Sequence, residues 1–77
     1  MQTTPTFDAI VEIVRARDAH RDALLVAHRN GQTHARAEEI GFTAGLEFAL
    51  DALKNAGEFV ASAEYLVRCH RTSEPVA

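Results

Sequence analysis

The chain has 77 residues, a net charge of −3 and one cysteine, and these values limit what it can be. Its length corresponds to a single domain, and a chain this short buries only about 60% of the surface that its unfolded form exposes. Cys69 has no second cysteine, which excludes an internal disulfide and favours reinforcement by a metal or a second protein chain. The charges form no block of like sign, so a polyanion-binding tail is not expected.

The composition also gives an expectation for cellular location. No apolar run approaches the roughly 20 residues that a membrane span requires. The first residues, Met-Gln-Thr-Thr-Pro, lack the basic and apolar regions of a signal peptide. We therefore expect a cytoplasmic protein with no membrane partner.

The first expected element is a helix over about residues 5–29. Its N-cap is either Thr4, with Pro5 at the first helical position, or Thr6. The apolar residues of this segment recur at steps of three and four, which is the helical period, at Phe7, Ile10, Val14, Leu24 and Leu25.

Two more helices are expected, over about residues 33–56 and 58–71. Asn30-Gly31 ends the first helix and Gly57 ends the second, because glycine readily adopts the left-handed conformation found after helix C-termini. Thr33 is the expected N-cap of the second helix. Residues 72–77 show no periodicity and are expected to be a frayed tail. The predicted fold class is all-α, as one domain over residues 1–77.

The short connection between the first two helices predicts how they pack. Helices joined by a few residues lie antiparallel, which gives a long helical hairpin. A turn centred near Gly31 brings residues whose numbers sum to about 63 level with each other, so Arg17 is expected beside Glu47. The third helix, about 20 Å long, covers roughly half of this hairpin.

Small and apolar residues predict tight packing and a dimer. Gly41, Gly45 and Ala49 follow four-residue steps, and a glycine within a helix costs up to ~1 kcal/mol relative to alanine, so we expect another helix to approach there. Larger apolar side chains occupy more than one stripe, which a lone hairpin cannot bury. A homodimeric bundle is therefore the favoured assembly. The residues predicted to pack between helices are Ile10, Val14, Gly41, Phe42, Gly45, Leu46, Ala49 and Leu53.

Arg17, Arg21 and His28 interrupt an otherwise apolar face of the first helix. One interpretation is a surface that binds a protein partner, since arginine is enriched at interface hot spots. The other is ordinary ion pairing, of Arg21 with Asp18 and of Arg17 with Glu47, and we favour this second interpretation.

Metal binding and catalysis have little support. His34 and Glu38 share a helix face near His28, and Cys69 and His70 would add ligands if the third helix folded back toward them. The chain nevertheless has no CxxC, HExxH or ExxH pattern, so no metal and no other cofactor is predicted. It also has no nucleophile elbow and no phosphate-binding loop, so we do not expect an enzyme.

One segment resembles the signature of helix-turn-helix DNA-binding proteins: Ala37-Glu38-Glu39-Ile40-Gly41-Phe42-Thr43, followed by Leu46, Ala49-Leu50, Leu53 and Ala56-Gly57. The resemblance covers about 25 residues. It implies a turn at Gly41 and a recognition helix whose groove-facing residues are Ala44, Gly45, Glu47 and Phe48. That helix has no basic residue before Lys54, whereas DNA binding requires several phosphate contacts from Lys or Arg.

The sequence therefore favours a small non-enzymatic interaction or regulatory module, an adaptor or inhibitor that acts through helical surfaces. This interpretation depends on the surplus of apolar surface. Its expected partners are a second copy of the chain and an unidentified protein, and nucleic acid is not expected. The alternative is a helix-turn-helix-like DNA-binding regulator that uses residues 33–57, and the third interpretation is a metal-binding helical protein.

Overall fold

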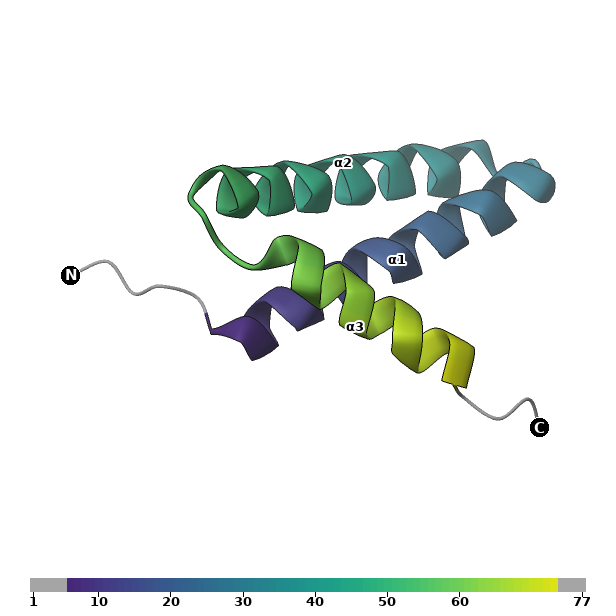
Figure 1. Ribbon diagram of the computed structural model, residues 1–77. Helices are drawn as coiled ribbons and strands as arrows, with labels where there is room; N and C mark the ends of the chain where they lie inside the picture. The colour runs from purple at the N-terminus through teal and green to yellow at the C-terminus, as the bar shows by residue number, and fades with distance from the viewer. Residues whose placement is uncertain (1–5, 74–77) are drawn as a thin grey trace.

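The computed structural model describes residues 6–73, which form three helices (Figure 1). They are α1 (Phe7–Arg29), α2 (Thr33–Asn55) and α3 (Val60–Ser73). The described part of the chain contains no strand. The prediction of an all-helical protein is confirmed.

Helix α1 begins two residues later than predicted, after Thr6. The Thr6 hydroxyl accepts a hydrogen bond from the backbone N–H of Ala9 at 3.2 Å, which satisfies one of the unpaired donors of the first turn. The alternative cap, Thr4 with Pro5, lies outside the described residues.

Both long helices end in the same way. Gly31, with φ of 67°, and Gly57, with φ of 87°, follow the last turns of α1 and α2 in the left-handed conformation. The next residue after each glycine donates its N–H back into the helix, from Gln32 to the Ala27 carbonyl at 2.9 Å and from Glu58 to the Leu53 carbonyl at 3.0 Å. The predicted glycine stops are therefore confirmed as Schellman motifs.

The start of α2 differs from the prediction. Gln32 occupies the N-cap position and makes no side-chain capping bond, while Thr33 is already the first helical residue. The Gln32 carbonyl accepts from the N–H of Arg36 at 2.9 Å. The turn that ends α1 is so short that the N-cap of α2 falls one residue earlier than expected.

Helix α2 runs without a break through Gly41. The turn implied by the helix-turn-helix resemblance does not form. A single glycine costs only up to ~1 kcal/mol within a helix, and the alanines and leucines around it favour the helical state. The resemblance therefore extends to the residues and not to the local structure.

The three helices meet in one small core. Residues 30–32 join α1 to α2, which run in opposite directions, and α3 crosses the N-terminal half of α1 (Figure 1). The core lies where all three converge, and a row of branched side chains on α1 provides its centre. Its buried residues are Ile10, Val11, Val14, Leu50, Val60, Ala63 and Val67, with Ile13, Leu53 and Leu66 packed around them. We refer to this region as the three-helix junction.

Helix α3 covers only part of the other two. It begins and ends two residues later than predicted, at Val60 and Ser73, while residues 74–77 of the expected tail lie outside the described part. Near the α1–α2 turn, Leu25, Val26 and Ile40 are about half exposed. The third helix therefore closes one end of the α1–α2 pair and leaves the other end uncovered.

Candidate functional site

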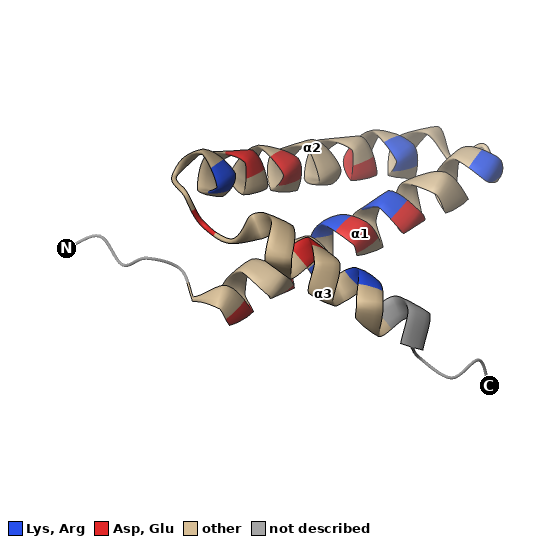
Figure 2. Ribbon diagram, viewed as in Figure 1, with Lys and Arg blue, Asp and Glu red and all other residues tan. Residues whose placement is uncertain are grey.

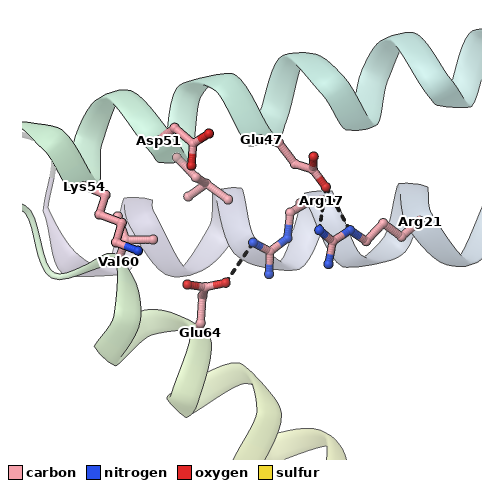
Figure 3. Close-up of a pocket in the computed structure, with 8 residues that line it drawn as sticks. Arg17, Arg21, Glu47, Asp51, Lys54, Val60 and Glu64 are labelled. Carbon is pink, nitrogen blue, oxygen red and sulfur yellow. Dashed lines mark hydrogen bonds and ion pairs between the residues drawn. The ribbon is translucent and has the colours of Figure 1, made fainter.

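A charged cleft lies beside the junction, between α1, α2 and the start of α3 (Figure 3). Its volume is about 250 Å³. Three cationic and three anionic side chains line it, together with two apolar ones. The lining residues are Arg17, Arg21, Lys54, Glu47, Asp51, Glu64, Leu50 and Val60. Because the two signs balance, the cleft has no net charge that would attract an ionic ligand.

Arg17 ties α1 to α3 across this cleft. Only 11% of its side chain is exposed, and its Nη1 donates to Glu64 Oε2 at 2.9 Å while Nη2 donates to Asp18 Oδ1 at 3.2 Å. Burial of the guanidinium lowers the pKa of Arg17, but the hydrogen bonds to Glu64 and Asp18 outweigh burial and raise that pKa above its usual value. The guanidinium of Arg17 is therefore engaged by carboxylates of the same chain.

Arg21 makes the ion pair that was expected of Arg17. Its Nε and Nη2 both donate to Glu47 Oε1, at 3.0 and 2.5 Å (Figure 3). The predicted pairing of Arg17 with Glu47 is therefore wrong, because α3 brings Glu64 to the side of α1 on which Arg17 lies. The sequence did not indicate where the third helix would pack.

Two of the three residues proposed as a partner-binding line share the cleft. Arg17 and Arg21 line the cleft, whereas His28 is exposed near the end of α1 and is not part of it. The histidine that does join the two long helices is His20. Its Nδ1 lies 2.5 Å from Glu39 Oε2, and its ring stacks on Phe42 with centroids 4.9 Å apart.

Only two of the suggested metal ligands, His34 and Glu38, are shown in contact. His34 Nε2 lies 3.1 Å from Glu38 Oε1 in an i, i+4 pair on the surface of α2. Among the described residues, no group of three or more His, Cys, Asp or Glu side chains is arranged to hold a metal ion. Neither Cys69 nor His70 is brought into a cluster with the two histidines near the turn.

A second candidate surface runs along the side of α2 that turns away from the junction. We call it the outer face of α2 and define it by Gly41, Ala44, Gly45, Phe48 and Ala52, all of which are exposed. At about 100° per residue, these positions lie opposite the buried residues of the helix, Thr43 and Leu50. None of these five residues is charged, and Glu38 lies in the same line one turn before Gly41. Phe48 stands at its centre, and 77% of its surface is exposed.

Few charged residues of α2 lie in its central part. Between Ile40 and Leu53 the only charged residues are Glu47 and Asp51, and both line the cleft. Figure 2 shows charged positions of both signs interspersed along α1 and α2. A solvent-exposed helix face usually carries Lys, Arg, Glu or Asp, so an uncharged face of this length is unusual.

The glycines of this face meet nothing within their own chain. A Cβ added at Gly41 or Gly45 would have no atom within 4 Å beyond the backbone of its own turns in the described structure. The close approach expected at these two positions is thus absent between α1 and α2, because the glycines point away from α1.

The other residues predicted to pack lie in different environments. Ile10 and Val14 are the two largest fully buried side chains, and Leu53 packs against the junction. Leu46 and Ala49 are partly buried. Phe42 remains 55% exposed beside His20.

Comparisons with known proteins add no relative: the chain matches no family model, no curated protein and no solved structure. Within the described residues, no helix is both long and apolar enough to cross a membrane. Evidence for function therefore comes from the surfaces of the chain itself.

Phe48 is the residue of this surface that the sequence did not assign to helix packing. Phe48 was interpreted only as a groove-facing residue of the helix-turn-helix resemblance. The signal that could have found it is the distribution of charge along α2, because every acidic residue between Ile40 and Leu53 falls on one side of the helix. The uncharged positions of α2, considered together with its small residues, indicate the exposed stripe.

Proposed function

We propose that this protein is a non-enzymatic interaction module of the adaptor or inhibitor type, and that it self-associates into a helical bundle through the outer face of α2. The observation that carries the proposal is an exposed helix face with no charged residue and with Phe48 at its centre. Exposed apolar stripes of this kind mark interaction surfaces in soluble proteins. The proposal thus assigns a role to the surface that the three-helix junction leaves uncovered.

The cleft supports a structural role rather than a catalytic one. Its two arginines are engaged by Glu47, Glu64 and Asp18, so these groups hold the helices together. Because carboxylates of the same chain occupy both guanidinium groups, neither arginine is open to a substrate. We accordingly place the function on the helix surfaces.

Light scattering over a range of protein concentrations tests the proposal. The chain is expected to reach twice its monomer mass of 8.4 kDa. The Phe48→Glu variant is expected to remain at the monomer mass, because the substitution places a charge in the apolar face. Phe59→Glu is the matched control, since Phe59 is 69% exposed but lies outside α2. A chain that stays monomeric at every concentration, or a Phe48→Glu variant that still dimerises, would overturn the proposal.

An electrophoretic mobility shift at low salt separates this function from DNA binding. The outer face carries no Lys or Arg, so no phosphate contact originates there. We expect no shift with duplex DNA. A sequence-preferring shift that Phe48→Glu abolishes would favour a DNA-binding regulator instead.

A further inference from the structure

The end of the α1–α2 pair that α3 leaves uncovered has very little core. We define this distal end as residues 22–40, which comprise the last part of α1, the connection and the first part of α2. Within this range only Ala27 is buried, and its side chain is a single methyl group. Leu24 is partly buried, while the other large aliphatic side chains of the range are about half exposed, namely Leu25, Val26 and Ile40. Apolar burial therefore contributes little to the stability of this end.

A histidine of α1 joins the two long helices next to the distal end. Its Nδ1 lies 2.5 Å from Glu39 Oε2, and its ring stacks on Phe42 with an interplanar angle of 21°. We refer to His20, Glu39 and Phe42 as the clasp. The side chains of His20 and Glu39 are 34% and 21% exposed, so water weakens their contact less than it weakens a contact between fully exposed groups.

The helical segments of the distal end are too short to be stable by themselves. In α1 the segment covers residues 22–29 and in α2 it covers residues 33–40. A helix shorter than about 12–15 residues is marginal in water unless it packs against other elements. Gly41 and Gly45 follow in α2, and glycine weakens a helix because it loses the most conformational freedom on folding. The distal end therefore depends on the junction and on the clasp.

We infer that the distal end opens as a unit while the three-helix junction stays folded, and that the clasp controls how often it opens. Proteins open locally in cooperative units, and a unit with few buried apolar contacts opens most readily. The junction buries seven apolar residues from three helices, whereas the distal end is held by one stacked and hydrogen-bonded histidine. The fold thus combines a firmly packed end with an end that opens. This inference concerns a single chain and does not rest on the proposed self-association.

Hydrogen exchange of the backbone amides, measured by NMR on the full chain under dilute, monomeric conditions, tests the inference. Protection factors in residues 24–28 and 36–40 should be lower than those in residues 10–14 and 50–53 by at least about tenfold. His20→Ala should lower the distal values by about a further tenfold and leave the junction values unchanged. His34→Ala is the matched control, since it changes helix propensity in the same way at a side chain that is 93% exposed and outside the clasp.

A variant of opposite sign completes the test. Gly41→Ala favours the helix and has space for its Cβ, so it should raise the protection of residues 36–40. Equal protection at the two ends of the unmodified chain would overturn the inference, because it would mean that the helices open only by global unfolding. A uniform loss of protection in His20→Ala, or an equal distal loss in His34→Ala, would overturn the role of the clasp.

Discussion

The three-helix junction and the outer face of α2 are built by the same helix and have opposite surroundings. At the junction, Leu50 of α2 is 3% exposed among branched side chains from α1 and α3. Two residues earlier, Phe48 is almost fully exposed on the other side. The larger apolar side chain thus lies in water while the smaller one is buried. The folded chain therefore buries only part of its apolar surface.

The largest expected effect separates buried from exposed isoleucine. Ile10→Ala removes a side chain that is 1% exposed and should lower the free energy of unfolding by about 2–5 kcal/mol, because the cavity left behind adds to the lost burial. Ile40→Ala, at a position 47% exposed, should change it by less than about 0.5 kcal/mol. Urea unfolding followed by circular dichroism measures both at one protein concentration. Equal losses in the free energy of unfolding for the two variants would contradict the distinction between the junction and the exposed surface.

The next effect concerns the ion pair that fixes α3 at the junction. A double-mutant cycle with Arg17→Met and Glu64→Gln should give a coupling of about 1–2 kcal/mol, between the values for exposed and buried pairs. The cycle with Arg21→Met and Glu47→Gln is the control. That pair is about half exposed, and its coupling should stay below about 1 kcal/mol. A larger coupling for the control would contradict the assignment of Arg17 to the junction.

Thr43 lies on the buried side of α2, opposite the outer face. It is buried, and its hydroxyl oxygen has no hydrogen-bond partner in the described structure. Thr43→Val keeps the shape and the branching of the side chain, so it should raise the free energy of unfolding by about 1 kcal/mol. The exposed Thr33→Val should have little effect, and a loss of stability in Thr43→Val would show that the hydroxyl is satisfied in solution.

The smallest effects compare two glycines under dilute, monomeric conditions. Gly45→Ala should stabilise the chain by up to ~1 kcal/mol, because alanine favours the helix and meets no neighbour. Gly57→Ala should destabilise it by about 1 kcal/mol, because Gly57 holds a φ of 87° that alanine rarely adopts. Thermal unfolding measures both, and a destabilised Gly45→Ala monomer would mean that α2 packs within its own chain at that position.

Local sequence signals predicted the helices well and their packing only in part. The glycine stops after α1 and α2 were predictable because they depend on backbone conformation at one residue. The docking of α3 was not, since it depends on which side of α1 the short apolar face of α3 meets. That uncertainty led to the wrong partner for Arg17.

The sequence predicted some residues of the candidate surface but not the direction in which they point. The small residues Gly41 and Gly45 drew attention to one side of α2, but their four-residue spacing does not reveal what that side faces. Burial of Thr43 and Leu50 places the glycines on the exposed side, and Phe48 then becomes part of the same surface. The period of a helix gives relative directions of side chains, and a second helix is needed to say which direction is inside.

The backbone amide spectrum of the four glycines tests the central claim most directly. Gly41 and Gly45 lie on the outer face of α2, whereas Gly31 and Gly57 end the two long helices and serve as internal controls. Spectra are recorded above and below the concentration at which the mass doubles. Between the two, the amide signals of Gly41 and Gly45 should shift, and those of Gly31 and Gly57 should stay in place. Shifts confined to Gly31 and Gly57, or four unchanged signals while the mass doubles, would contradict the assignment of this face as the contact surface.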